Sequence, residues 1–372
     1  MRPESFRILV APAAFKGTLT AAQVAAAMTA GCRAALPGAV IKSIPLADGG
    51  AGTVACLVAA IGGVMHEVVV RGPVGASVSA VFGLSGDGRE AFVETAAAAG
   101  LALLDGRAGN PLATSTYGVG QLVRAALRHG PERLIIGLGD SATNDGGAGL
   151  LQALGCQFLD VAGLELSSPL TGGGLALVHD VLATGLDSAL EGCHVTAATD
   201  VDNPLLGAQG CARMYGPQKG AGPAAVERLE MGMARYADVL ERRFMVDYRN
   251  RPGAGAAGGM GFGLMVVLRA ERRSGIDLVL QRTGFRDLLR GVDLVLTGEG
   301  RVDAQTARGK VVAGVTAAAR ETGTRVIAVV GQAEPGMDAG ELGLDRLVVL
   351  GGEPDPLHAA ARVTLAVRRA LA

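Results

Sequence analysis

Hydrophobic and polar positions follow the same alternating pattern near both ends of the chain. Short apolar runs are followed by glycine-rich turns and then by stretches with apolar residues every three or four positions. The apolar runs are typical of parallel strands buried on both faces, and the longer stretches are typical of amphipathic helices. Predicted strands of this kind cover residues 8–11, 40–46, 292–296, 326–330 and 347–350.

The first helix shows clear start and stop signals. Thr20 and Gln23 have the spacing of a capping box, which predicts a helix that begins there. Apolar residues recur at every fourth position from Val24 to Cys32, and a Pro-Gly pair at 37–38 then ends the helix. Together with the strands on either side, this segment predicts a βαβ unit.

The pattern changes in the middle of the chain. Residues 64–94 contain short strands at 68–70, 78–82 and 91–93, separated by turn residues, which indicates antiparallel pairing. Further strands at 134–138 and 194–199 again end in polar loops. We therefore expect an α/β fold in which both chain ends, 1–62 and 286–372, form a Rossmann-like parallel-sheet domain, and residues 63–285 form an inserted mixed α/β domain.

Composition narrows the class of protein. The 372 residues are 49% hydrophobic, which is enough for a large core in two domains. The net charge of -1 does not indicate binding to nucleic acid or to a membrane surface. No apolar run approaches the ~20 residues of a membrane helix, and no signal peptide is recognisable. Five cysteines without a CxxC pair favour reduced thiols. We expect a cytoplasmic protein that acts on small molecules, and the sequence is compatible with an oligomer.

Candidate chemistry concentrates after the strand at 292–296. The segment TGEGRVDAQT at 297–306 supplies Glu299, Arg301, Asp303 and Gln305 within one glycine-rich loop. Ligands collect outside the carboxyl ends of parallel strands, and this mixture suits an anionic substrate and a divalent cation. The alternative is a charged loop that is merely solvated.

Other strands are also followed by polar residues. The acids in these loops, all among glycine or other turn formers, are Asp48, Asp145, Asp200 and Asp202. Each acid taken alone is equally well explained as a turn residue. Lys16 and Lys219 are either ligands of a phosphate or carboxylate or structural lysines. Phosphoryl transfer needs acids for Mg²⁺, cations and an oriented hydroxyl, which these loops supply together.

The chain contains one literal nucleotide-binding motif and lacks another. Gly253, Gly255 and Gly258 form a literal GxGxxG, but the mostly polar residues 245–251 precede it, so the strand of a dinucleotide fold is missing. Contact with phosphates and close helix packing both stay open for these glycines. A Walker P-loop is absent, because Lys310 is followed by Val311 and an earlier glycine is lacking.

Seven segments in order resemble the motifs of the bacterial two-domain glycerate kinases. They are FKGTLTA at 15–21, PLADGG at 45–50, SATNDGG at 141–147, DVDNPL at 200–205, YGPQKGA at 215–221, PGAGAAGG at 252–259 and TGEGRVDAQT at 297–306. The resemblance covers nearly the whole chain. It implies ATP-dependent phosphorylation of D-glycerate, commonly to 2-phosphoglycerate, with Mg²⁺ and on two α/β domains around a cleft.

The resemblance also gives hypotheses for individual residues. The expected catalytic residues are Asp303, Asp200, Arg301 and Lys16. Mg²⁺ ligands are expected among Asp200, Asp303 and Asp145. Nucleotide contacts are expected from Gly253, Gly255, Gly258, Ser141, Asn144 and Lys219, and substrate contacts from Asp48, Glu299 and Gln305.

The chain departs from the family pattern at a few positions. Ala13 and Ala14 stand where the family usually has Asp and a polar residue, and Ala51 stands where it usually has Glu. Asp140 stands where many members have glycine, which adds an acid nearby without obviously replacing either loss. The alternative hypothesis is therefore a weakened or redirected homologue that binds or phosphorylates another small hydroxy acid.

Overall fold

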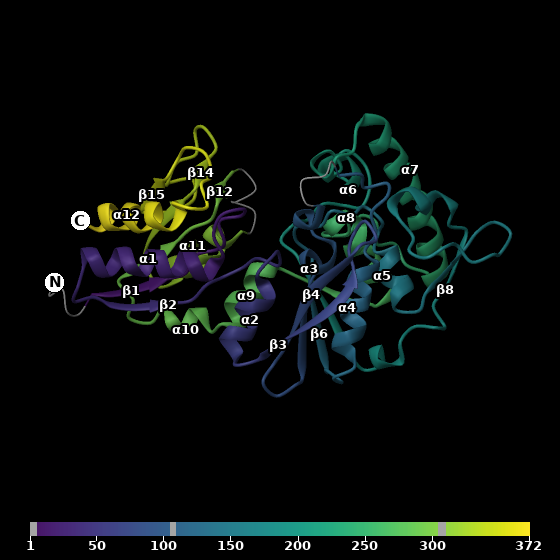
Figure 1. Cartoon of the computed structure of the whole chain (residues 1–372), viewed down its shortest axis with the longest axis horizontal. Helices are drawn as coiled ribbons and strands as arrows, with labels where there is room; N and C mark the ends of the chain where they lie inside the picture. Colours follow the sequence, from purple (N-terminus) through teal and green to yellow (C-terminus); the bar gives the residue numbers. More distant parts are fainter. Residues whose placement is uncertain (1–5, 105–108, 304–309) are drawn as a thin grey trace. The chain divides into compact units, whose positions relative to one another are not determined.

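The fold consists of two compact units. The computed structural model describes residues 6–104, 109–303 and 310–372. One unit is formed by Met1–Asp48 and Gly275–Ala372, and the other by Gly49–Ser274 (Figure 1). The second unit is thus an insertion in the first. The expected fold class, a parallel-sheet domain from both chain ends with an inserted mixed α/β domain, is confirmed.

The first unit is built on a five-stranded parallel sheet. Its strands are β1 (Arg7–Val10), β2 (Val40–Ser43), β11 (Leu294–Thr297), β13 (Arg325–Val330) and β15 (Arg346–Val349). Their order is β15-β13-β11-β1-β2, and every neighbouring pair is parallel. In the centre, Ile8 lies opposite Leu294, so strands from the two chain ends pair directly. A short parallel pair, β12 (Arg301–Val302) and β14 (Gln332–Ala333), follows the carboxyl ends of β11 and β13.

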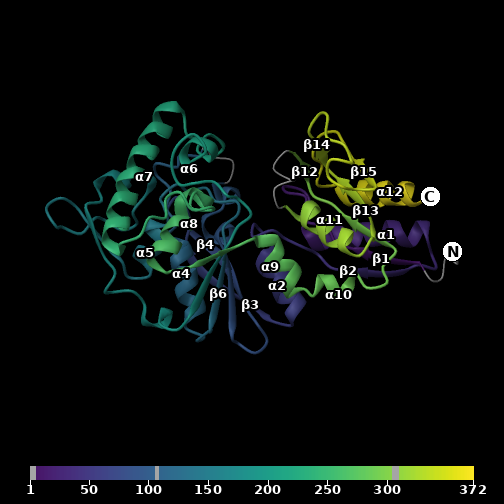
Figure 2. The same cartoon turned by 180° about the vertical axis from the view of Figure 1, so that it is seen from behind.

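Helices cover both faces of this sheet. Helices α1 (Ala21–Ala35) and α12 (Ala359–Leu371) lie side by side on one face, and α11 (Val311–Glu321) lies on the other (Figure 2). Right-handed crossovers that leave the centre of a parallel sheet in opposite directions generally place helices on both of its faces. The predicted capping box begins α1: the Gln23 N–H donates to Thr20 Oγ1 at 3.2 Å, and the Thr20 N–H donates to Gln23 Oε1 at 2.8 Å. Two shorter helices, α9 (Gly275–Arg282) and α10 (Phe285–Leu288), precede β11.

The second unit contains a six-stranded mixed sheet. Its strands are β3 (Val64–Arg71), β4 (Ser77–Leu84), β5 (Glu90–Glu94), β6 (Arg133–Gly137), β9 (His194–Ala198) and β10 (Glu271–Arg273). The order is β10-β9-β6-β5-β4-β3. The pairs from β10 to β5 are parallel, and β5-β4-β3 is an antiparallel meander. The change from parallel-type to antiparallel patterning that the sequence predicts at residues 64–94 is therefore present.

Helices and short ribbons complete the second unit. The helices are α2 (Thr53–Ile61), α3 (Thr95–Ala99), α4 (Tyr117–Leu127), α5 (Ala148–Ala153), α6 (Cys211–Tyr215), α7 (Pro223–Phe244) and α8 (Ala256–Val267). The 3-10 turns are η2 (Leu101–Leu104), η3 (Gly172–Leu177), η4 (Ser188–Leu190) and η5 (Pro217–Lys219), and β7 (Gln157–Leu159) pairs with β8 (Asp180–Leu182). One large apolar core joins the sheet to these helices. Among the helices in the described ranges, none combines the length and the hydropathy that a bilayer crossing requires.

The positions of two helices bear on the domain boundaries. Helix α2 contacts β4 and β5 of the mixed sheet, whereas α9 contacts α11 of the parallel-sheet unit. The compact units accordingly change at Asp48/Gly49 and at Ser274/Gly275. The boundaries expected from the sequence, 62/63 and 285/286, differ because the short helices α2 and α9 carry no local signal of the unit on which they pack. Those domain limits stay a prediction.

Candidate functional site

In each unit, the candidate residues lie in loops that follow the carboxyl ends of parallel strands. In the parallel-sheet unit these loops follow β1, β2 and β11, and in the mixed unit they follow β5, β6 and β9. Side chains from neighbouring loops meet at such an edge, which is where open α/β sheets bind ligands.

The loops after β1 and β11 pack against each other backbone to backbone. The Ala13 N–H donates to the Gly298 carbonyl at 2.8 Å. A Cβ added at Gly300 would lie 3.1 Å from the Lys16 backbone nitrogen. This close approach brings the exposed Lys16 side chain next to the loop that carries Glu299 and Arg301.

The loop after β11 mixes buried and exposed polar groups. Glu299 is only 5% exposed, whereas Arg301 is exposed on β12. Lys310 Nζ donates to Asp303 Oδ1 at 3.1 Å, so this half-buried carboxylate is paired with a cation. Asp48, after β2, is also half-buried. The expected substrate contact Gln305 lies outside the described residues.

The mixed unit contains a buried ammonium group. Lys219 is 3% exposed, and its Nζ donates to Ser141 Oγ at 2.8 Å and to the Thr143 carbonyl at 2.7 Å. Burial lowers the pKa of Lys219 to about 8. No carboxylate in the described part of the chain lies within ion-pair distance of this ammonium. The structure thus brings Lys219 and Ser141 together, and among the residues that it describes the cation has no anionic partner within ion-pair distance.

The residue after Thr143, whose carbonyl accepts from Lys219, carries a buried amide. Asn144 is fully buried, and neither its Oδ1 nor its Nδ2 has a hydrogen-bond partner among the residues that the structure describes. The same holds for Thr143 Oγ1. Buried polar groups without partners are rare and point to a bound polar molecule or an ordered water. This observation supports the expectation that the loop at 141–147 contacts a polar ligand.

Asp145 has a different environment. It is fully buried, and its carboxylate accepts hydrogen bonds from the Thr116 N–H and Oγ1, both at 2.7 Å, and from the N–H groups of Gly147 and Gly149, both at 3.3 Å. Burial raises its pKa, although these hydrogen bonds oppose the shift. Four donors on one carboxylate favour a role in positioning the loop. Its expected role as a Mg²⁺ ligand stays a prediction.

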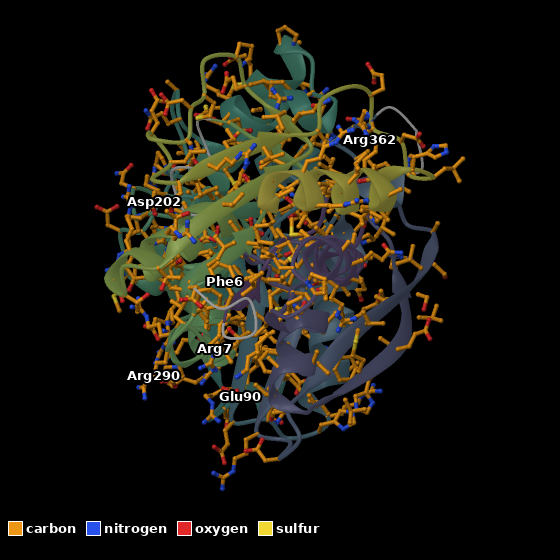
Figure 3. All side chains as sticks on the ribbon, turned by 90° about the vertical axis from the view of Figure 1, so that its left-hand side faces the viewer. Phe6, Arg7, Glu90, Asp202, Arg290 and Arg362 are labelled. Atoms are coloured by element: carbon orange, nitrogen blue, oxygen red, sulfur yellow. The ribbon has the colours of Figure 1, made fainter. Side chains whose placement is uncertain are left out.

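Two further acids follow β9. Ser274 Oγ donates to Asp200 Oδ1 at 2.7 Å. Arg272 Nη2 lies 2.5 Å from Asp202 Oδ1, and Asp202 lies at the molecular surface (Figure 3). Asp200 is therefore the more enclosed of the two acids. Across the described ranges, no cluster of three or more Asp, Glu, His or Cys side chains has metal-site geometry.

The glycine-rich segment at 253–258 is buried against protein backbone. A Cβ at Gly255 would lie 2.4 Å from the Pro204 carbonyl oxygen, and one at Gly258 would lie 2.1 Å from the Thr143 carbonyl oxygen. The Gly258 φ of +69° also favours glycine. The close-packing alternative thus accounts for these two glycines, and Gly253 is buried beside the Arg272 side chain. Phosphate contact by the three glycines stays a prediction.

Glu94 is a polar residue that the sequence did not single out. It is 8% exposed, and its carboxylate accepts hydrogen bonds from the N–H groups of Gly52 and Val54 at the start of α2. Burial raises the pKa of Glu94, and the neighbouring Asp140 charge adds to the shift. The available signal was an acid directly after the apolar strand at 91–93. Its partners at the start of α2 are forty or so positions away, beyond the reach of local patterns.

Comparison with known proteins places this geometry in a family. A sequence profile described as the Glycerate kinase family matches residues 8–369. The chain is 46% identical over 325 residues to a glycerate kinase of Bacillus subtilis (strain 168), covering 87% of this chain and 85% of the relative. It is 44% identical to the glycerate 2-kinase of Escherichia coli (strain K12), with the same coverage. A solved structure from Salmonella typhimurium LT2, provisionally assigned as glycerate kinase 2, superposes with a TM-score of 0.84 at 40% identity and covers 99% of this chain and 97% of that one. The chain therefore belongs to the glycerate kinase family.

Proposed function

We propose that the protein transfers the terminal phosphoryl group of ATP to D-glycerate, with Mg²⁺, and that the product is 2-phosphoglycerate. The choice of product rests on the relative from Escherichia coli, which is named a glycerate 2-kinase and is 44% identical. Use of ATP is consistent with the expected cytoplasmic location.

The observation that carries the proposal is the buried Lys219 ammonium. A buried charge without an opposite partner is costly, and truly isolated ones are rare. An anionic group of a bound ligand offsets that cost. The unpaired amide of Asn144, which follows the Thr143 carbonyl that Lys219 contacts, adds hydrogen-bonding capacity in the same loop. A phosphate has both the charge and the acceptor oxygens that such a site requires, so we assign Lys219, Ser141 and Asn144 to the nucleotide or to the transferred phosphoryl group.

The remaining cations and acids have roles that suit phosphoryl transfer. Lys16 and Arg301 are exposed cations in adjoining loops, and they would meet the carboxylate of glycerate or a phosphate. Asp48, Glu299 and Gln305 would contact the acceptor. A carboxylate such as Glu299, which is almost completely buried, accepts hydrogen bonds from hydroxyl groups and so orients the attacking oxygen.

The donor set also fits Mg²⁺. This ion prefers oxygen ligands and is usually held by one or two carboxylates together with substrate phosphates and water, so a cage of three protein carboxylates is not required. Asp200 after β9 and Asp303 after β11 are partly exposed carboxylates, and each is a candidate ligand of the ion within its own unit. When bound, Mg²⁺ neutralises charge that develops on the transferred phosphoryl group. Asp145 fits less well because four donors already occupy its oxygens.

A coupled assay for ADP release tests the proposal. We would supply ATP, Mg²⁺ and, in turn, D-glycerate, tartronate and other small hydroxy acids, and identify the product by ³¹P NMR. We expect turnover with D-glycerate and a signal at the 2-position. A folded protein that turns over none of these acids would contradict the kinase function, and a signal at the 3-position would contradict only the regiochemistry.

A second candidate, phosphorylation of a different hydroxy acid, is favoured by one specific observation. The Ala13 N–H donates to the carbonyl of Gly298, the residue before Glu299. The resemblance to the family implies a carboxylate at position 13, and alanine does not supply one. The same panel of acids decides between the two candidates. A kcat/KM for D-glycerate that exceeds the value for every other acid would exclude the redirected enzyme.

A further inference from the structure

The mixed unit contains a pocket beside β10, the strand that ends the strand order of its sheet. The lining comes from the end of α7 and the segment after it, and from the end of α8 and the segment that leads into β10. The pocket has a volume of about 590 Å³, within the roughly 300–1,000 Å³ that is typical of small-molecule sites. None of its lining residues is among those assigned above to the nucleotide, the acceptor or Mg²⁺.

Part of the lining is apolar. Met265 and Val266, in the last turn of α8, are buried and belong to the core of the unit. Phe244 and Val246 are partly buried and pack against the same core. Side chains that are continuous with a core are held firmly by their neighbours, and an apolar group placed on them loses contact with water. This part of the pocket therefore suits the apolar or aromatic body of a ligand.

The rest of the lining is mostly cationic. Arg251, Arg269 and Arg272 line the pocket, and Glu271 is the one carboxylate among the lining residues. Arg272 Nη2 lies 2.5 Å from Asp202 Oδ1. In the described ranges, no carboxylate lies within ion-pair distance of Arg251 or Arg269. Guanidinium groups that gather without carboxylate partners attract an anion, since each carries a full charge and several N–H donors.

Arg251 is held in place through the flat face of its side chain. Its Cζ lies 3.6 Å from the centroid of the Tyr248 ring, and its backbone N–H donates to the Tyr248 carbonyl at 3.0 Å. Stacking occupies the face of the guanidinium, so the N–H groups in its plane stay available. Arg249 differs, because it donates to Glu241 and to Asp238, both at 2.7 Å. Of these two neighbouring arginines, one is neutralised by acids of α7 and the other faces the pocket without such a partner.

Arg269 lies where glycine would be less strained. Its φ is +54°, in the left-handed region, and it directly follows Leu268, the C-cap of α8. Helices commonly end with glycine at this position, and a residue with a side chain loses stability there. A strained residue that lines a pocket is a candidate for a binding role. The structural alternative is a cation that interacts favourably with the C-terminal end of the α8 dipole.

Arg272 contributes a donor that is not yet used. Its Nε is buried and has no hydrogen-bond partner among the residues that the structure describes. A Cβ added at Gly253 would lie 3.2 Å from Arg272 Cγ, so the stem of this side chain is packed against the loop before α8. Buried donors without partners point to a bound polar molecule or an ordered water.

We propose that this pocket binds a small organic anion, a carboxylate or phosphate ester that carries an apolar or aromatic group, at a site separate from the catalytic one. The guanidinium groups of Arg251, Arg269 and Arg272 match the oxygens of a carboxylate or a phosphate. The apolar lining takes the rest of the ligand. Glycerate and inorganic phosphate have little or no apolar surface and would leave that lining uncovered.

Isothermal titration calorimetry on the full chain tests the proposal. Phenyl phosphate and 3-phenylpropionate are the probes, because each joins an anion to an aromatic ring. We expect a Kd of roughly 1 mM or below for at least one of them, and the tighter binder shows whether the pocket prefers phosphate or carboxylate. Inorganic phosphate has the charge alone and benzyl alcohol has the ring alone, so both should bind at least tenfold more weakly. No saturable binding of either probe, or equal binding of inorganic phosphate and phenyl phosphate, would overturn the proposal.

Two variants locate the bound probe. Arg269→Gly should weaken its affinity roughly tenfold or more, the usual range for a lost charged hydrogen bond, while the melting temperature stays constant or rises because glycine tolerates the positive φ. Arg251→Ala should weaken the affinity by a similar factor. Arg228→Ala is the matched control, since Arg228 is an exposed arginine of α7 that does not line the pocket. Unchanged affinity in both Arg269→Gly and Arg251→Ala would overturn the proposal, and a lower melting temperature of Arg269→Gly would then assign this residue to the α8 dipole.

The phosphate site assigned to Lys219 is the competing location for phenyl phosphate. Lys219→Met should bind the probe as the unaltered chain does, and saturating Mg·ADP should not displace it. Binding that is lost in Lys219→Met but kept in Arg269→Gly, or displacement by Mg·ADP, would place the probe in the nucleotide site and overturn the proposal. A chain that binds the probe with the expected pattern of variants but does not phosphorylate D-glycerate would contradict the kinase function alone.

Discussion

Replacement of Asp145 by Asn should destabilise the mixed unit even when no ligand is present. Asp145 carries no exposed surface, and its carboxylate is the acceptor for the backbone N–H groups of Gly147 and Gly149 and for both donors of Thr116, 29 positions earlier. Asparagine has the same shape but only one acceptor oxygen. Its NH₂ group would face donors in place of an acceptor.

The size of the effect follows from these contacts. A hydrogen bond to a charged acceptor contributes about 1.5–3 kcal/mol, and the two 2.7 Å bonds from Thr116 should carry most of it. Relief of the buried charge offsets part of the loss. Breaking such a buried, charged network usually costs about 3–5 kcal/mol. For a unit of this size, we expect the melting temperature to fall by roughly 6–20 °C.

The assay is thermal unfolding by circular dichroism without Mg²⁺ or nucleotide. Asp160→Asn is the matched control, because Asp160 also accepts two backbone N–H groups but lies in a partly exposed loop, so its loss should cost less than about 1 kcal/mol. A melting temperature of Asp145→Asn within about 1 °C of the unaltered chain would refute the positioning role. A destabilisation that appears only when Mg²⁺ is present would favour the metal-ligand role instead.

The raised pKa of Asp145 adds a second readout. In the folded state this carboxyl holds its proton to a higher pH than in the unfolded chain. Between the unfolded value of 3.8 and the raised folded value, the folded state binds more protons, so the free energy of unfolding falls as pH rises through this window. Asp145→Asn should lack this part of the pH dependence.

Three further outcomes follow from the described contacts. Asp303→Asn should lower kcat at least ~100-fold with little change in melting temperature, since the carboxylate is partly exposed. Retained activity in steady-state kinetics would show that the loop at 297–306 is a solvated loop without a catalytic role. Because the pKa of Lys219 is about 8, its positive charge is lost as pH rises above that value, so the KM for ATP should rise several-fold from pH 7 to ~9.5; a constant KM would contradict phosphate contact. Gly258→Ala should lower the free energy of unfolding by about 3 kcal/mol or more, because its Cβ would lie 2.1 Å from the Thr143 carbonyl oxygen. Gly207→Ala, with a similar positive φ and no atom within 4 Å of its Cβ, should lower it by about 1 kcal/mol. Equal losses in chemical unfolding would show that the close contact at Gly258 is unimportant.

The architecture could be predicted from the sequence because its signals are local. Apolar runs such as residues 326–330 are buried on both faces of a parallel sheet, and the Thr20–Gln23 capping box acts within one turn of a helix. These patterns depend on neighbouring residues alone. The family motifs likewise located the strand-end loops correctly, since the carboxyl ends of parallel strands are where such folds carry their polar residues.

The detailed roles of the acids could not be predicted in this way. Asp145 and Asp200 look alike as sequence, each an acid after a strand, yet one is fully buried under four donors and the other is partly exposed beside Ser274. The same limit applies to Gly258, whose close partner is the Thr143 carbonyl from a distant loop. Burial and long-range partners decide these roles, and neither is encoded by spacing within a motif.

The pairing of Ile8 with Leu294 also determines the order in which the chain can fold as it is synthesised. Strands β1 and β2 leave the ribosome first, but their sheet lacks its centre until β11 has been made. At ordinary translation rates this interval lasts roughly 15–60 s, long enough for the inserted unit to fold in the meantime. The apolar β1 must stay unaggregated throughout that wait. Nascent chains that stall before residue 294 should therefore be the species most dependent on chaperones.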